Sequence, residues 1–220
     1  MDLSSDQIRQ VLIYVFVLLI SVALHEFGHA IVAHKLGDDT PSRQGRVTLN
    51  PLAHADLIGT FLLPLIGGLY GGGGFGWGKP VQWQPHRITR KVSMSAAKIM
   101  VAVAGPTMNL LLAVTLAVVD AILLSQNVYG WHGPVDAILR FAVQINFVLF
   151  FFNLLPLPPL DGGHVAQSFV PYRQREQFDQ FARYAPFVLL GIIMIPSIGR
   201  IFTWPAQQLT IHLFALLGLT

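Results

Sequence analysis

Residues 11–33 read VLIYVFVLLISVALHEFGHAIVA, an apolar run that is long enough to cross a membrane as one helix. Glu26 is its only formally charged residue. A carboxylate is costly inside a lipid bilayer, and ionisable residues at that depth usually serve a function. The run therefore predicts a membrane-spanning helix that carries a chemical site.

The remaining composition is also that of a membrane protein. Of the 220 residues, 53% are hydrophobic and 11% are charged, whereas a soluble domain has about 25% charged residues. Residues 99–119 and 141–160 are further uncharged runs near spanning length. Residues 184–199 and 201–220 are also uncharged, but prolines and glycines interrupt them, so they form either two spans or one bent hairpin. We expect a single all-α polytopic membrane domain over residues 1–220.

A short apolar segment, residues 57–69, contains Pro64 and runs into a glycine cluster, which argues against a complete crossing. If this segment enters and leaves the membrane on one side, most of the basic residues gather on that side. The positive-inside rule then places that side in the cytoplasm and the N-terminus outside. We therefore expect a re-entrant segment. The basic residues concerned are Lys35, Arg43, Arg46, Lys79, Arg87, Arg90, Lys91, Lys98, Arg173, Arg175 and Arg183.

Residues 25–29, His-Glu-Phe-Gly-His, form an HExxH pattern. Positions i and i+4 lie on one helix face, so both imidazoles can bind one Zn²⁺ while Glu26 reaches a water molecule beside it. Helix-end histidines or a buried ion pair would give the same residues without catalysis. The chain has no cysteine, so any further ligand has to be a histidine or a carboxylate.

The best candidate for a third ligand is Asp161, which follows the run NLLPLPPL of residues 153–160 and precedes two glycines. The prolines stop regular helix, and the glycines allow the chain to turn beside the carboxylate. A turn aspartate without a metal is the alternative. With the short segment re-entrant, the first and fourth apolar segments end at the same membrane face, which brings His25, His29 and Asp161 to one depth.

Together, these stretches resemble the site-2 protease family of intramembrane zinc metalloproteases. The HExxH pattern and residues 153–163 match the family's two signatures, and residues 104–109, AGPTMN, are similar to the A-G-P-x-x-N stretch of its intervening core helix. The resemblance implies a three-helix catalytic core with flanking helices, in the compact form without PDZ or CBS domains. It implies Zn²⁺ as the cofactor, with His25, His29 and Asp161 as ligands and Glu26 as the general base.

The resemblance also implies an endopeptidase that hydrolyses peptide bonds within or near the transmembrane segments of other membrane proteins. Its partners would be these substrates and the lipid bilayer of the cell membrane, with the active site toward the cytoplasm. Asn109 and Asn153 are expected near the substrate or the transition state, although each amide would equally serve to tie helices together. Residues 71–84 resemble the family's membrane-associated β-loop, to which an extended substrate adds as a strand; a plain loop is the alternative.

Two other classes of function stay open. A catalytically silent member would bind zinc and membrane partners without cleavage, and an ion transporter would use the intramembrane His, Glu and Asp as a path. The HExxH spacing favours hydrolysis over both. The basic residues of positions 79–91 suit anionic lipid headgroups better than nucleic acid, so no nucleic-acid partner is expected. His54 is expected to be structural or solvated, and His164 is left without a role.

Overall fold

The computed structural model describes residues 4–69, 76–89 and 91–219. Helices dominate, and no strand occurs in these three ranges. Short 3₁₀ turns at residues 51–53, 85–87 and 172–174 and a π-helical turn at Leu57–Leu62 lie between them. The α-helices are α1 (Ser5–Leu36), α2 (Thr40–Arg43), α3 (Leu63–Leu69), α4 (Met94–Ser125), α5 (Pro134–Asn153), α6 (Asp161–Phe169), α7 (Arg175–Met194) and α8 (Pro196–Leu216).

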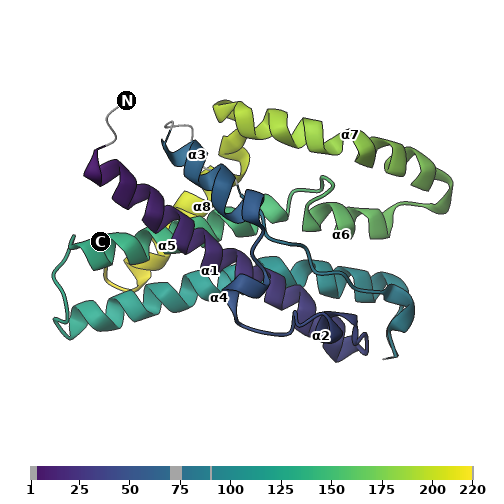
Figure 1. The fold of residues 1–220 in the computed structure, drawn as a ribbon, viewed down its shortest axis with the longest axis horizontal. Coiled ribbons are helices and arrows are strands. Elements are labelled where there is room, and N and C mark those ends of the chain that lie inside the picture. The colour runs from purple at the N-terminus through teal and green to yellow at the C-terminus, as the bar shows by residue number, and fades with distance from the viewer. Residues whose placement is uncertain (1–3, 70–75, 90, 220) are drawn as a thin grey trace.

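Three long helices form the core of the bundle. α1, α4 and α5 are each long and apolar enough to cross a membrane, and they pack against one another at the centre of the molecule (Figure 1). α7 and α8 meet at a bend of 75° and add one further span if they count as a single broken helix. Figure 1 shows α7 along one edge of the molecule, above α6. The prediction of an all-α polytopic membrane protein is thus confirmed.

The boundaries and packing of α1 follow from its sequence. The Ser4 hydroxyl accepts a hydrogen bond from the Gln7 N–H, and the Gln7 side chain accepts one from the Ser4 N–H, which caps the first turn. Gly37 ends the helix in the left-handed conformation, with a φ of 112°. α1 lies close to α4 because Gly28 has no side chain: a Cβ there would lie 2.6 Å from the Ala104 carbonyl oxygen. The HExxH residues are therefore held directly against α4.

The span predicted for residues 141–160 begins and ends earlier, as α5 over Pro134–Asn153. Proline suits the first helical position, where its missing N–H is not needed. The prolines of residues 156–159 stop the helix, so the uncharged run is longer than the span. The chain then turns, and α6 begins at Asp161.

The segment predicted to be re-entrant is helical from Leu57 to Leu69. A π-helical turn of six residues continues into the seven residues of α3. At about 1.5 Å per residue these turns reach roughly 20 Å, which is less than the ~30 Å hydrocarbon layer of a membrane. The segment packs beside α1, where Gly68 faces Val11. Its length agrees with a re-entrant path.

The described part of the hairpin expected over residues 71–84 contains no strand. Residues 71–75 lie outside the described ranges, and residues 76–84 are extended but are not assigned as a strand. Along one edge, this extended segment makes single hydrogen bonds to other parts of the protein. These bonds do not form the regular ladder that defines a sheet. The segment passes beside the functional residues of α1.

Candidate metal centre

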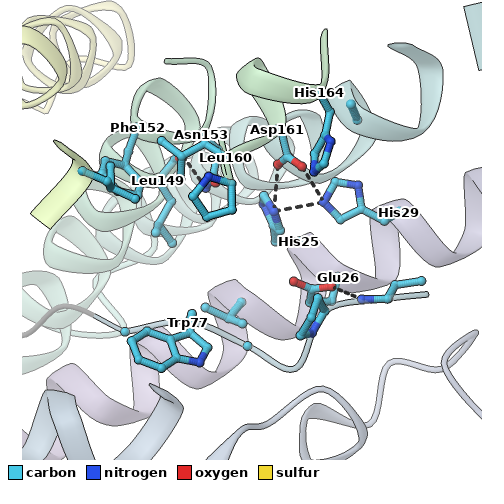
Figure 2. A pocket seen from close by; sticks show the side chains of 18 of the residues that line it. His25, Glu26, His29, Trp77, Leu149, Phe152, Asn153, Leu160, Asp161 and His164 are labelled. Carbon is cyan, nitrogen blue, oxygen red and sulfur yellow. Dashed lines mark hydrogen bonds and ion pairs between the residues drawn. The ribbon is translucent and has the colours of Figure 1, made fainter. Parts of the chain in front are cut away.

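The three side chains predicted as zinc ligands lie together inside the bundle (Figure 2). His25 and His29 project from α1, and Asp161 is the first residue of α6. The Nε2 atoms of the two histidines are 3.1 Å apart, and each lies near one oxygen of Asp161, at 3.1 Å for His25 and 3.3 Å for His29. Donor atoms of a tetrahedral zinc site with bonds of about 2.0–2.1 Å lie roughly 3.3–3.4 Å apart. The spacing therefore suits one zinc ion.

Hydrogen bonds on the far side of each imidazole decide where its proton lies. His29 Nδ1 is 2.7 Å from the Val101 carbonyl oxygen, which can only accept. His25 Nδ1 is 2.7 Å from Asn109 Oδ1, and this amide is oriented because its Nδ2 donates to the Ser21 carbonyl. Both Nδ1 atoms therefore carry the proton, and both Nε2 atoms present a lone pair to the centre.

This arrangement fits a bound cation. Two nitrogen lone pairs and a carboxylate converge, and Asp161 Oδ2 is buried yet accepts no hydrogen bond from any residue whose place is described. In this tautomer the lone pairs would repel one another unless a cation lies between them. Two neutral imidazoles and one carboxylate are also a donor set of catalytic zinc sites, which keep a fourth position open. The residues present thus fit a zinc ion.

Glycines create the space for this centre. Gly105 of α4 lies directly against the imidazoles, and a Cβ there would collide with the ring of His29. Gly162 lets the start of α6 pack on the preceding turn, where a Cβ would collide with the Leu154 carbonyl oxygen. The A-G-P and D-G-G stretches of the sequence therefore have a steric role beside the ligands.

Glu26 lies beside the three candidate ligands without joining them (Figure 2). It is 9% exposed, and its Oε2 accepts a hydrogen bond of 2.9 Å from the Val81 N–H. Val81 belongs to the extended segment of residues 76–84, so this segment orients the carboxylate. A carboxylate in this position can exchange a proton with water in the adjoining cavity.

Alternate residues of the extended segment bond toward the body of the protein. The N–H groups of Trp77, Lys79 and Val81 donate to the Gly59 carbonyl, the His54 carbonyl and Glu26. Successive residues of an extended chain direct their backbone groups to opposite edges. The backbone groups of Gln82, an exposed residue, therefore face the other edge of the segment, whereas Gly78 is buried.

A cavity of about 1410 Å³ opens onto the centre (Figure 2). Residues of α1, α3, α4, α6, α7, the extended segment and the end of α5 line it, and most of them are apolar. Small-molecule pockets are usually about 300–1,000 Å³, so this cavity has room for a stretch of peptide. Asn153, whose Nδ2 donates to the Leu149 carbonyl at 3.0 Å, and His164, one turn after Asp161, are among its polar side chains.

Two residues considered from the sequence lie away from this cavity. Asn109 is fully buried, and both of its N–H groups are engaged, by the Ser21 carbonyl and by Asn146 Oδ1. Both N–H groups tie helices together, which was the alternative for this amide; a place near the substrate or the transition state stays a prediction. His54 is also fully buried, with Nε2 2.9 Å from the Thr48 carbonyl oxygen, and it is not among the described residues that line the cavity.

Sequence reasoning did not single out Ser21 or Asn146, which join Asn109 in a polar contact between the core helices. A serine or asparagine within an apolar run is a common tie between helices and has no specific signal. One indication was available, because Ser21 precedes His25 by one helical turn and so lies on the ligand face of α1.

Comparison with known proteins identifies relatives along most of the chain. The model of "Peptidase family M50" matches residues 13–132 and 121–196. The "Putative zinc metalloprotease YwhC" of Bacillus subtilis is 36% identical over 197 residues, which cover 87% of this chain and 84% of that protein. The "Putative zinc metalloprotease Rip2" of Mycolicibacterium smegmatis is 34% identical over 209 residues, covering 91% of this chain and 76% of that protein. No solved structure matches the chain.

Proposed function

Because the chain belongs to peptidase family M50 and is a zinc metalloprotease of the site-2 protease type, we propose that it cleaves peptide bonds within or near the transmembrane segments of membrane-protein substrates. The position of the metal centre carries this proposal. His25 and His29 lie on a helix that is apolar enough to span a membrane, and the cavity beside them is lined by α5 and α7 as well. A protease with its metal at this place meets its substrates in the membrane.

We assign the zinc ligands to His25, His29 and Asp161. Zinc bound there supplies a Lewis acid and favours the ionisation of a nearby water molecule. The Val101 carbonyl and Asn109 hold the two imidazoles in the tautomer that metal binding requires. Asn109 is thus a positioning residue.

Glu26 is the general base in this proposal. Its carboxylate takes a proton from the water molecule that attacks the scissile carbonyl and gives the proton to the departing amine, so no covalent acyl-enzyme forms. The Val81 N–H holds Oε2, which leaves Oε1 to exchange the proton.

A substrate helix has to unwind before it is cut, because its own hydrogen bonds occupy the scissile carbonyl. The outer edge of residues 76–84, at the exposed Gln82, offers backbone partners to an extended peptide. Asn153 lines the cavity and is the candidate donor to the negative charge that develops on the scissile oxygen. These groups would bind the unwound segment beside Glu26.

We further propose that the protein lies in the cell membrane with the metal centre toward the cytoplasm. The helical segment Leu57–Leu69 is too short for a simple crossing, and a re-entrant path gathers the basic residues between Lys35 and Lys98 on one side. The HExxH residues occupy the half of α1 that leads to this side. Residues 1–220 then act as one domain.

Purified protein in liposomes, together with a single-span substrate whose span contains a helix break, tests the proposed function. Cleavage that requires zinc and stops in Glu26→Gln is the expected result. Zinc binding without cleavage of any unwound peptide would instead indicate a silent membrane partner. Metal or proton flux across the liposome without cleavage would indicate a transporter. Either outcome overturns the proposal.

A further inference from the structure

We propose that Ser21 and Asn146 are positioning residues for the reaction, which fix His25 through a chain of hydrogen bonds across the three core helices. The proposal rests on the proposed function, since it takes His25 as a zinc ligand. Ser21 lies on α1, Asn109 on α4 and Asn146 on α5, and none is more than 1% exposed. At such burial in a membrane-spanning bundle, water does not replace a lost partner.

The chain starts at the carbonyl of Ala142. A carbonyl oxygen only accepts, so the atom of Asn146 that lies 2.9 Å from it has to be Nδ2. Ser21 Oγ donates to the Val17 carbonyl at 2.8 Å and therefore accepts from the same Nδ2, at 2.9 Å. These two acceptors set the orientation of the Asn146 amide. Its Oδ1 then faces Asn109.

Asn109 receives its orientation from both neighbours. Its Nδ2 donates to Asn146 Oδ1 at 2.9 Å and to the Ser21 carbonyl at 3.2 Å. Its Oδ1 is left to accept from His25 Nδ1 at 2.7 Å. Every bond in the chain has one possible direction, so Asn146 Oδ1 and the Ser21 carbonyl together fix the amide that decides where the proton of His25 lies.

His29 does not depend on such a chain. Its Nδ1 faces the Val101 carbonyl, a backbone acceptor that no single side-chain change reverses. Without Asn146, the Ser21 carbonyl is the one remaining acceptor described for Asn109 Nδ2. The amide is then less firmly oriented, and His25 can adopt the tautomer that has its proton on Nε2. That proton occupies the position required for the metal. Partners of this kind change metal affinity or activity by about 10–100-fold.

The test measures zinc affinity by competition with a chelator, and the visible spectrum of the cobalt-loaded protein gives a second readout. Asn146→Leu removes the amide at similar volume, and we expect zinc affinity to fall by about 10-fold or more, with a changed cobalt spectrum. Asn146→Gln keeps an amide with both a donor and an acceptor and should recover part of the affinity. Gln144→Leu, the matched control on α5, changes an amide outside the chain and should behave as the native protein.

Native zinc affinity and a native cobalt spectrum in Asn146→Leu would overturn the proposal, as would an equal loss in Gln144→Leu. If Asn146→Leu does not fold, Ser21→Ala decides instead: we expect a several-fold loss of affinity, and no loss would overturn the proposal. Failure of the zinc assignment on which this proposal rests looks different, because the native protein would then bind no zinc, or His25→Ala would bind it equally tightly; loss of cleavage with native zinc binding would count against the proposed function alone.

Discussion

Among the described residues, two of the buried groups that contain carboxylates balance their charge in different ways. The first is the metal centre, and the second, here called the arginine cluster, consists of Asp120, Tyr129, Asp136 and Arg140. In the arginine cluster, Arg140 Nε donates to Asp136 Oδ1 at 2.6 Å and lies 3.9 Å from Asp120 Oδ2, while the Tyr129 hydroxyl donates to Asp120. This cluster supplies its own cation. In the metal centre Asp161 meets two imidazole lone pairs, so the cation has to come from outside.

The two groups lie toward opposite ends of α4. Gly105, beside the imidazoles, and Asp120 are roughly 22 Å apart along the helix axis at 1.5 Å per residue. Arg140 also donates to the Leu219 carbonyl at 3.1 Å and lies 4.5 Å from the centre of the Phe214 ring, so the arginine cluster joins the chain end after α8 to α5. Buried charge alone therefore does not identify the catalytic site. The catalytic site is identified by lone pairs that converge where the protein supplies no cation of its own.

The largest effect is expected from Glu26→Gln, which leaves the metal centre intact and removes only the base. We expect cleavage to fall by about 10²–10⁴-fold, because proton transfer to and from water is lost. Zinc content, measured by metal analysis of the same sample, should stay at the native level. A variant that cleaves at close to the native rate would contradict the role of Glu26.

Asp161→Ala tests the metal centre itself. Loss of a direct ligand should weaken zinc binding by more than the roughly 10–100-fold expected for an outer partner. Chelator competition measures the affinity, and added zinc should restore part of the cleavage. Affinity equal to that of the native protein would place the metal elsewhere.

Arg140→Met tests the arginine cluster in the same way, by removing its cation. Two buried carboxylates then lack their partner, and we expect a loss of about 3–5 kcal/mol in unfolding free energy. Detergent-induced unfolding measures this loss, while zinc affinity should be native. Arg43→Met is the control, because Arg43 pairs with Asp39 at the surface and should change stability little. A zinc-binding defect in Arg140→Met would show that the two groups are coupled.

Tyr129→Phe is expected to have the smallest effect. Burial and the Asp120 carboxylate raise the pKa of Tyr129, so its hydroxyl remains a hydrogen-bond donor at neutral pH. Losing that donor should lower the unfolding free energy by about 1–3 kcal/mol. Unfolding measured beside Arg140→Met checks the order of the two effects. A larger loss in Tyr129→Phe would mean that the hydroxyl, rather than the guanidinium, holds the arginine cluster together.

Several of these features could be predicted from the sequence because they depend on rules that act over a few residues. The spacing of His25 and His29 places both on one helix face, and prolines and glycines around Asp161 indicate a turn. The all-α membrane fold followed from long uncharged runs. Hydropathy alone overestimated the end of α5, since it ignores the helix-breaking prolines after Asn153.

The rest depends on contacts between helices that no local pattern contains. For Asn109 the sequence left two roles open, near the substrate or as a tie between helices, and only its neighbours on α1 and α5 show that both N–H groups join helices. The proposed role of Asn146 depends on its hydrogen bonds with Asn109 and Ser21, which are far from it in sequence. The direction of a hydrogen bond follows from which acceptor faces which donor, and that information exists only in the folded bundle.

X-ray absorption at the zinc edge of the purified, cleavage-competent protein tests the central claim most directly. We predict one zinc ion per chain with two imidazole nitrogens and oxygen donors, and the loss of this signal in Asp161→Ala. A zinc ion whose environment lacks imidazole, or is the same in Asp161→Ala as in the native protein, would contradict the assignment of His25, His29 and Asp161.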